Sequence, residues 1–214
     1  MKKVAIIGAT GKVGSLITEK AIAKGFDVTA IIRDASKMTD KNIPVIEKSV
    51  LDITLSDVSD FDTVIAAYGV TLGHETDLSA YAKHLTEIFE QANRPRLIVV
   101  GGAGALYLDE SRTIRRVDEL EKENFPWFPT IREWAAASLI YKASSSKADI
   151  TFFSPADFFD YEGAETGNYT ITGEILEKNS AGISRISYRD YAAALVEIVA
   201  SDSHHERHIG IFEN

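Results

Sequence analysis

Short β-branched runs alternate with helix-like segments along the first three-quarters of the chain, and this alternation limits the possible folds more than any other feature. Such alternation is typical of βαβ units, whose strands pair in parallel. The runs are apolar on both faces, as expected where helices cover both sides of a sheet. We therefore predict an α/β fold with a doubly wound, mostly parallel sheet. Its predicted strands span residues 3–7, 28–32, 45–48, 63–67, 96–100 and 150–154.

Apolar residues also recur at helical spacing in four segments. The first predicted helix ends before Gly25, where a left-handed C-terminal cap is expected. The last begins with Asp190 as its N-cap. Beyond it, residues 209–212 predict a strand at an edge of the sheet. The four predicted helices lie around residues 13–21, 78–89, 132–146 and 191–199.

The stretch 157–187 differs in character, because glycines interrupt short polar and β-branched segments. Such punctuation is typical of hairpins and loops rather than of another βαβ unit. No flexible linker or internal repeat separates this stretch from the rest of the chain. A chain of 214 residues is within the usual size of one α/β domain. We predict a single domain over residues 1–214, with 157–187 as a small lobe on its substrate side.

Charge and composition argue against several classes of partner. The net charge of −9 repels phosphate backbones and anionic lipid headgroups, so we expect neither nucleic acid nor a membrane as the main partner. The chain contains no cysteine, which excludes disulfides, thiolate metal sites and a cysteine nucleophile. This composition fits a reducing compartment, and we expect a cytoplasmic location. The first apolar run is too short for a signal peptide or a membrane-spanning helix.

A glycine loop with the spacing Gly8-x-x-Gly11-x-x-Gly14 joins the first predicted strand to the first helix. The first glycine permits a tight turn, the second lets backbone approach a phosphate, and the third lets the helix lie close to the strand. Backbone N–H groups and the positive end of the helix dipole then point to where a pyrophosphate binds. The loop predicts a Rossmann-like nicotinamide dinucleotide site, with a purely structural turn as the alternative. Its residues are Gly8, Ala9, Thr10, Gly11, Lys12, Val13 and Gly14.

In such a site, the residue at the end of the second strand normally contacts the adenosine ribose. An acid there favours NAD, whereas an arginine pairs with the extra phosphate of NADP. Arg33 occupies this position, and Asp34 follows it, from where a carboxylate can still reach a ribose hydroxyl. The positive charge of Arg33 leads us to predict NADP(H) in preference to NAD(H).

Together with the glycine loop, several segments along nearly the whole chain resemble one known family. On these segments the chain resembles the atypical short-chain dehydrogenase/reductase group, whose members are NAD(P)H-binding proteins and NADH-flavin reductases related to biliverdin-IXβ/flavin reductase. The segments are VAIIGATG (4–11), DTVIAAYG (62–69), VVGGAG (99–104) and SPADFF (154–159), followed by ETGNY (165–169) and ISYRDY (186–191).

The resemblance implies roles for residues that directly follow the predicted strands. Those after the third strand would lie beside the adenine, and those after the fourth along the ribose and phosphates. Those after the fifth would form the floor of the nicotinamide site, and those after the sixth would approach the carboxamide. Open α/β sheets bind ligands at such strand ends. In chain order these residues are Asp52 and Ile53, then Ala67, Tyr68 and Gly69, then Gly102 and Ala103, and finally Pro155 and Ala156.

One part of the family's chemistry is missing. Short-chain dehydrogenases that reduce carbonyls move a proton with a Tyr-x-x-x-Lys pair, but Arg132 and Ala136 stand where that pair would fall. Tyr141 is followed four residues later by Ser145, so another register does not restore the pair. Ala105 also stands where relatives often carry a serine. Ordinary carbonyl reduction therefore lacks its proton donor.

A flavin or quinone can accept a hydride without such an acid, because conjugation stabilises the added charge and water can supply a proton. We therefore predict an oxidoreductase that transfers a hydride from NADPH to a flavin or quinone-like acceptor, with no catalytic side chain identified, as a monomer or homodimer. A non-catalytic NADP(H)-binding redox sensor fits the same residues. A nucleotide-sugar epimerase is the third alternative, less favoured because its chemistry usually needs the missing tyrosine.

Aromatic side chains near the expected nicotinamide end can stack on a planar acceptor, although core packing is the more common role of such residues. The charge-dense run 109–123 is expected to form a solvated helix, or alternatively a lid. His204 and His208 have the spacing of a helical metal pair, but they follow the last predicted helix, so we expect a solvated loop and no metal site. The candidate substrate contacts are Tyr107, Trp134 and Phe158.

Overall fold

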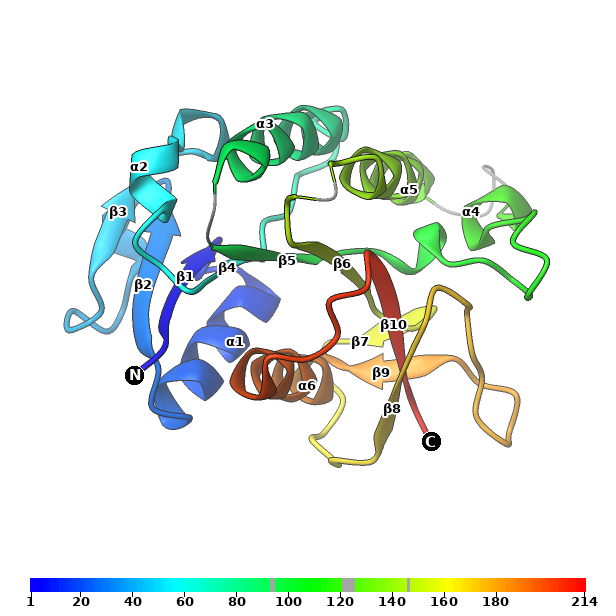
Figure 1. Cartoon of the computed structure of the whole chain (residues 1–214). Coiled ribbons are helices and arrows are strands. Elements are labelled where there is room, and N and C mark those ends of the chain that lie inside the picture. Colours follow the sequence, from blue (N-terminus) through cyan, green and yellow to red (C-terminus); the bar gives the residue numbers. More distant parts are fainter. Residues whose placement is uncertain (93–94, 121–125, 146) are drawn as a thin grey trace.

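The computed structural model describes residues 1–92, 95–120, 126–145 and 147–214. In this part of the chain, eight strands form one sheet (Figure 1). They are β1 (Lys3–Ile7), β2 (Asp27–Ile32), β3 (Val45–Glu47), β4 (Thr63–Ala66), β5 (Arg96–Val100), β6 (Ile150–Ser154), β8 (Tyr169–Thr172) and β10 (His208–Glu213). Their order across the sheet is β3-β2-β1-β4-β5-β6-β10-β8, and neighbours are parallel except for β10 and β8. The predicted doubly wound, mostly parallel sheet is confirmed.

Helices cover both faces of this sheet (Figure 1). On one face lie α1 (Lys12–Ala23) and α6 (Tyr188–Ser201), in contact with each other, and on the other lie α3 (Asp77–Gln91) and α5 (Phe128–Lys142). Short helices connect the main elements: α2 (Leu55–Val58), α4 (Arg116–Glu119), and the 3-10 turns η1 (Ala35–Lys37), η2 (Val50–Asp52) and η3 (Ala103–Ala105).

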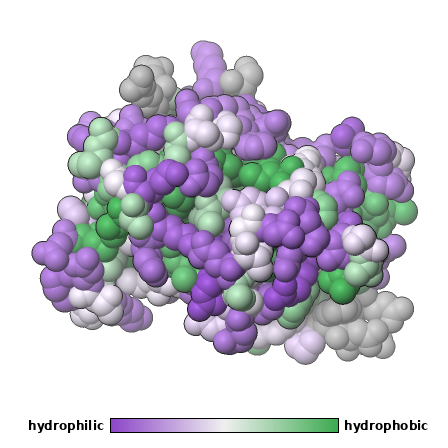
Figure 2. Space-filling view, turned by 90° about the horizontal axis from the view of Figure 1, so that it is seen from below, coloured by the Kyte–Doolittle hydropathy of each residue, from purple (hydrophilic) through white to green (hydrophobic). Residues whose placement is uncertain are grey.

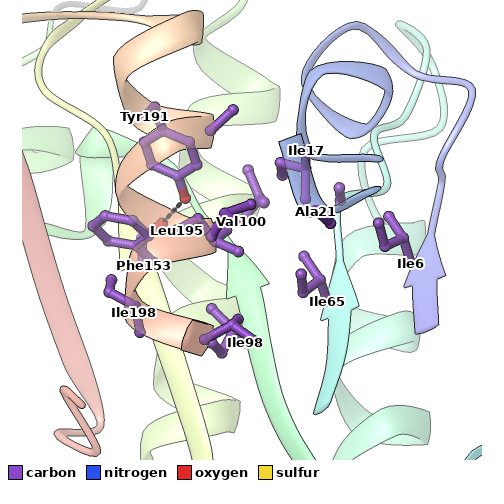
Figure 3. Close-up of a cluster of buried hydrophobic side chains, with 14 of the residues drawn as sticks. Ile6, Ile17, Ala21, Ile65, Ile98, Val100, Phe153, Tyr191, Leu195 and Ile198 are labelled. Carbon is purple, nitrogen blue, oxygen red and sulfur yellow. Dashed lines mark hydrogen bonds between the residues drawn. The ribbon is translucent and has the colours of Figure 1, made fainter. Parts of the chain in front are cut away.

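Alternate strand residues fill the two layers between sheet and helices, because successive side chains of a strand point to opposite faces. Ile6 and Phe153 lie in the layer with α1 and α6 (Figure 3). Val64 and Phe152 lie in the layer with α3 and α5. The Tyr191 hydroxyl of α6 donates a hydrogen bond of 2.7 Å to the Phe153 carbonyl, so its polar end is satisfied inside the apolar layer.

The C-terminal part of the sheet differs from the prediction in its pairing. Residues 209–212 do not form an edge strand, because β10 lies between β6 and β8, and β8 is the edge. The predicted hairpins in 157–187 are also wrong. There β7 (Phe158–Asp160) pairs in parallel with β9 (Arg185–Ser187), while β8 pairs antiparallel with β10. Short glycine-flanked runs signal a strand locally, but tertiary contacts choose its partner.

Helix boundaries in the middle of the chain also differ. The α5 helix begins at Phe128 rather than at Arg132, because Pro129 fits a first helical turn, where its missing N–H costs no hydrogen bond. The helix ends at residue 142 rather than 146. Of the charge-dense run 109–123, only the single turn α4 is helical among the described residues, and residues 121–123 lie outside them.

Ser187, and not Asp190, is the N-cap of α6. The Ser187 hydroxyl accepts a hydrogen bond of 2.9 Å from the Asp190 N–H. Asp190 is instead buried in the first turn, where its carboxylate accepts from the backbone N–H groups of Thr166 and Gly167 at 3.0 and 2.8 Å. Asp190 therefore anchors the loop before β8 to the start of α6.

Hydrophilic residues cover much of the face seen from below (Figure 2). Figure 2 shows them enclosing small hydrophobic areas on this face. Within the described residues, no helix combines the length and the apolar character needed to cross a membrane.

His208 is a buried polar residue at the start of β10. Its Nε2 atom lies 2.8 Å from the hydroxyl of Ser154 at the end of β6. Burial lowers the pKa of His208 to about 4, Lys142 adds to this shift, and Glu174 opposes it. The imidazole is therefore neutral in the folded protein at neutral pH.

We expect His208 to make the fold sensitive to acid. The unfolded chain binds a proton at the ordinary histidine pKa of 6.5, whereas the folded chain binds it only near 4. The contribution of His208 to the free energy of unfolding is therefore constant above pH 6.5. It falls by about 1.4 kcal/mol per pH unit between the unfolded and the folded pKa of His208. Urea unfolding at pH 7 and pH 4.5 measures the loss of free energy of unfolding on acidification. This loss should be about 2–3 kcal/mol smaller in His208→Gln than in the wild type.

The matched control is His74→Gln, because the His74 side chain is 68% exposed. This variant should lose as much stability on acidification as the wild type. An equal loss in His208→Gln and in the wild type would show that His208 does not carry the acid sensitivity.

Candidate functional site

The carboxyl ends of β1 to β6 lie along one edge of the sheet, because these strands are parallel. The chain runs from β1 outward through β2 to β3 and then returns to β4 on the other side of β1. The order of the strands therefore reverses between β1 and β4. Open α/β sheets bind their ligands in the crevice outside this point.

Two glycines of the loop at this crevice, Gly8 and Gly14, leave no room for a side chain. Gly8 has a φ of +81°, and a Cβ atom there would lie 2.7 Å from the carbonyl oxygen of Ala67. A Cβ atom at Gly14 would lie 2.2 Å from the Gly8 carbonyl oxygen. The ends of β1 and β4 and the start of α1 thus approach more closely than any other residue type permits. Residues 10–12 are exposed at the rim, so this cradle fits a phosphate-bearing group.

The start of α1 completes the cradle. Gly11 is the N-cap and provides no side-chain hydrogen bond, and no acidic residue occupies the first turn. The helix N-terminus therefore keeps its positive character, which favours an anion. Lys12 is the first residue of α1, and its Nζ atom lies 4.6 Å from the centre of the Tyr161 ring. The sequence patterns did not single out Tyr161, because nothing local links it to the loop.

Arg33 and Asp34 follow β2 at the same edge. Arg33 is exposed, and the described residues offer it neither an ion pair nor a hydrogen bond. Burial raises the pKa of Tyr81 on α3, and the charge of Arg33 opposes this rise. Asp34 already accepts from the N–H and the hydroxyl of Ser36, at 3.0 and 2.6 Å, which lowers its pKa. The carboxylate is thus engaged in a local turn, whereas the guanidinium is available.

Asp52 and Ile53 follow β3 in different environments. Asp52 is exposed and accepts a hydrogen bond of 2.6 Å from the Ser49 hydroxyl. Ile53 is buried, and its carbonyl oxygen lies 2.9 Å from the Nε2 atom of His84 on α3. Because a carbonyl only accepts, His84 donates and fixes this backbone segment to α3.

The residues after β5 and β6 lie at the other end of the edge. Gly102 and Ala103 are partly exposed, whereas Pro155 and Ala156 are buried. A Cβ atom at Gly102 would lie 3.2 Å from the Cβ atom of Trp134 on α5. Trp134 therefore supports this backbone from behind.

Tyr68, after β4, points its side chain into the protein. Its ring stacks on Trp134 with centroids 5.6 Å apart, and its hydroxyl lies 2.7 Å from that of Tyr141. Burial raises the pKa of both hydroxyls, so both remain protonated at neutral pH. Only the backbone of Tyr68, followed by the exposed Gly69, can line the crevice.

The three predicted substrate contacts lie in separate settings. Trp134 is half-buried behind Gly102, Phe158 is 58% exposed on β7, and the Tyr107 ring lies 5.3 Å from the Nζ atom of Lys142. No contact joins these three rings within the described residues. Tyr107 follows β5 and Phe158 follows β6, whereas Trp134 lies on α5, and the direction of each ring depends on the fold.

An ion pair that the sequence patterns missed lies near the carboxyl ends of β5 and β6. Arg116 of α4 donates to both carboxylate oxygens of Asp157 at 2.8 and 2.9 Å. This hydrogen bonding raises the pKa of Arg116. The pair joins the segment after β5 to the segment after β6. Charge density indicated ion pairs near Arg116 but not this partner, which is 41 residues away.

The histidines do not form the metal pair considered from their spacing. His204 lies in the loop after α6, whereas His208 belongs to β10. The described residues contain no group of three or more histidine or acidic side chains able to hold a metal. Two cavities of 420 and 380 Å³ lie elsewhere, one beside Arg96 at the amino ends of the strands and one between α4 and α5.

Comparison with known proteins agrees with this geometry. Residues 8–202 match the family described as NAD(P)H-binding. The chain is 38% identical over 204 residues to YwnB of Bacillus subtilis (strain 168), a match that covers 94% of each chain. It is 34% identical to SP1627 of Streptococcus pneumoniae TIGR4, a proposed NADH-flavin reductase, with a TM-score of 0.91 over 100% of both chains. A proposed epimerase from Bacteroides thetaiotaomicron is 28% identical, with a TM-score of 0.85 over 99% of this chain and 97% of that one.

The family match covers most of the chain, including the glycine loop from Gly8 onward. The identity to YwnB extends over nearly the full length of both proteins. The chain therefore belongs to the NAD(P)H-binding family, within the atypical short-chain dehydrogenase/reductase group that its motifs resemble.

Proposed function

We propose that this protein is an NAD(P)H-dependent oxidoreductase that transfers a hydride from NADPH to a flavin or quinone-like acceptor. The proposal rests on the combination of two features. The glycine loop forms a cradle suited to a dinucleotide, and the chain lacks the Tyr-x-x-x-Lys pair that donates a proton in carbonyl reduction. Arg132 and Ala136 stand on α5 at the positions of the usual Tyr-x-x-x-Lys. Tyr141 does not replace that tyrosine as a proton donor, because its side chain is buried and its hydroxyl is hydrogen-bonded to that of Tyr68.

Each strand end contributes one part of the site. Backbone N–H groups of the glycine loop and the start of α1 hold the pyrophosphate, and Arg33 pairs with the ribose phosphate. The Gly102–Ala103 peptide lies beneath the nicotinamide, and Pro155 and Ala156 lie beside its carboxamide. When bound, NADPH supplies the hydride. The protein's contribution is to hold the two reacting rings at a separation of about 3–3.5 Å.

The acceptor is a planar conjugated ring system, because the chain lacks the Tyr-x-x-x-Lys pair that protonates a carbonyl substrate. Conjugated acceptors stabilise the transferred charge and can take a proton from water. The description of SP1627 as a proposed NADH-flavin reductase supports this class of acceptor. The description of another neighbour as a proposed epimerase carries less weight, because epimerisation usually needs the missing tyrosine.

A redox sensor that binds NADP(H) without turnover would use the same cradle and would also need no acid. The two functions differ in one measurable respect. A sensor must bind the oxidised and reduced cofactor with different affinity, since a ligand shifts an equilibrium only through differential binding. Turnover of an added acceptor supports the reductase.

The first test follows NADPH oxidation at 340 nm with FMN, riboflavin and a quinone. We expect turnover with at least one acceptor. Gly11→Ala should weaken NADPH binding by about tenfold or more, because the added methyl group lies where backbone approaches the phosphates. A Cβ atom there would lie 3.2 Å from the Gly8 carbonyl oxygen, so a small adjustment accommodates it and the fold should persist.

The control for this variant is Gly173→Ala, where a Cβ atom meets nothing within 4 Å. It should bind NADPH like the wild type. Absence of turnover with every acceptor would overturn the reductase, and unchanged affinity in Gly11→Ala would remove the glycine loop from the site.

The second test addresses cofactor preference. Arg33→Glu should weaken NADPH binding by about 10- to 100-fold, because a charge-assisted contact to the phosphate is replaced by repulsion. NADH binding should change by less than about threefold, since NADH lacks that phosphate. Titration of protein fluorescence with each cofactor measures both affinities.

Lys178→Glu is the control for the change in net charge, because Lys178 is exposed in the loop after β8. It should leave both affinities nearly unchanged. Equal losses for NADPH and NADH in Arg33→Glu would mean that Arg33 does not read the ribose phosphate.

A further inference from the structure

Two buried side chains converge on the backbone at the nicotinamide end of the edge. The Ser154 hydroxyl lies 3.0 Å from the carbonyl oxygen of Gly102 and 2.8 Å from the Nε2 atom of His208. Ser154 and His208 are 0% and 5% exposed. The Ala105 N–H also donates to the Gly102 carbonyl, at 3.2 Å. Both lone pairs of this carbonyl oxygen are therefore occupied.

The direction of these hydrogen bonds follows from the number of protons. A serine hydroxyl has one proton, and a carbonyl oxygen can only accept. Ser154 therefore donates to Gly102, and His208 must carry its proton on Nε2 and donate to Ser154. The Nδ1 atom of His208 is then a bare acceptor, which agrees with its lack of a hydrogen-bond partner among the described residues.

Charged groups around His208 act on its protonation in opposite directions. Its Nδ1 atom lies 3.9 Å from the Glu174 carboxylate, which is in turn paired with Lys142 at 2.5 Å and with Arg112 at 3.0 Å. Burial disfavours the imidazolium most, Lys142 and Arg115 add to this effect, and Glu174 opposes it, while the Phe152 ring lies in an edge-to-face arrangement with the imidazole. The histidine therefore remains a neutral donor at neutral pH.

Joining β6 to β10 does not require the serine–histidine pair. The two strands pair in parallel through their backbones, and the Phe152 N–H donates to the Arg207 carbonyl at 2.9 Å. The pair instead fixes the orientation of one peptide group. In a trans peptide the carbonyl and the following N–H point in opposite directions, so fixing the Gly102 carbonyl also fixes the Ala103 N–H.

We propose that Ser154 and His208 are positioning residues, which set the Gly102–Ala103 peptide at the height and angle that hydride transfer requires without touching the cofactor. This inference rests on the proposed function, in which that peptide lies beneath the nicotinamide. Reacting groups displaced by about 1 Å can lose about 100-fold in rate, so a remote hydrogen bond is able to govern the reaction.

The proton arrangement has a direct test that needs no cofactor. Two-dimensional ¹⁵N–¹H NMR of the histidine rings should show His208 protonated on Nε2 and unprotonated on Nδ1 at pH 7. His208→Gln identifies the signals, because they disappear in this variant. A proton on Nδ1 would mean that Ser154 donates to the histidine and not to Gly102, which overturns the proposal.

The functional test compares Ser154→Ala with Ser138→Ala. Ser138 is a matched control, because its buried hydroxyl also donates to a backbone carbonyl, that of Ala135 at 2.8 Å. Ser154→Ala should lower the single-turnover rate of NADPH oxidation by about tenfold and leave the dissociation constant of NADPH within about twofold. Ser138→Ala should change neither value.

Substitution of His208 separates positioning from packing. His208→Gln keeps an N–H donor where Nε2 was and should stay within about threefold of the wild-type rate, whereas His208→Leu should match Ser154→Ala. Thermal unfolding measured alongside shows that each variant is folded. Equal rates in Ser154→Ala and Ser138→Ala, or equal losses in His208→Gln and His208→Leu, would overturn the positioning role.

Fluorescence of bound NADPH distinguishes failure of this inference from failure of the proposed function. If the wild type binds NADPH but turns over no acceptor, the reductase fails. The nicotinamide emission should still differ between Ser154→Ala and Ser138→Ala, because the floor beneath the ring has moved. Identical emission spectra would overturn the positioning role, and a wild type that does not bind NADPH would overturn both proposals.

Discussion

The close approach between the ends of β1 and β4 is the constraint on which the candidate site depends. Gly8 takes a φ of +81° with its α-carbon against the Ala67 carbonyl, and Gly14 lies against Gly8 in turn. A side chain at Gly8 would push the segments after β1 and β4 apart, and one at Gly14 would push α1 away from the end of β1. The crevice between the two strands would then lose the backbone groups that face it. The same contact that completes the fold thus creates the surface suited to a phosphate, which is why the glycine loop serves both purposes.

Buried and half-buried polar groups organise the remainder of the edge. His84 holds the segment after β3, the Tyr68–Tyr141 pair lies behind the segment after β4, and Ser154 with His208 holds the segment after β5. Each of these hydrogen bonds joins groups that come from different segments of the chain. A buried polar group without a partner costs about 1–3 kcal/mol, so these pairs specify how the loops lie on the helices and strands. The loops at this edge are therefore fixed by hydrogen bonds on their inner side, and their outer side is accessible to a ligand.

The prediction of the fold succeeded where the signal was local and repeated. Strands 3–7, 96–100 and 150–154 have the predicted bounds, because apolar β-branched runs ended by glycine or polar residues mark buried parallel strands. It failed where pairing joins distant segments. Nothing in residues 158–160 or 185–187 indicates that they pair in parallel, and β10 became an inner strand only because β8 returns to cover it. Asp190 has the composition of an N-cap, but Ser187 took that role because the Asp190 carboxylate binds a loop more than twenty residues away.

The sequence by itself determined strands β1 to β6, the glycine loop and the family, because each depends on residue types at fixed short spacing. It also showed that the Tyr-x-x-x-Lys pair is missing, which directs the chemistry toward an acceptor that needs no acid. Only the tertiary structure decided where the aromatic rings point, that Asp157 pairs with Arg116, and that Ser154 and His208 meet beneath Gly102. Those contacts join residues between 41 and 54 positions apart, and their partners are chosen by the packing of whole elements rather than by any local pattern.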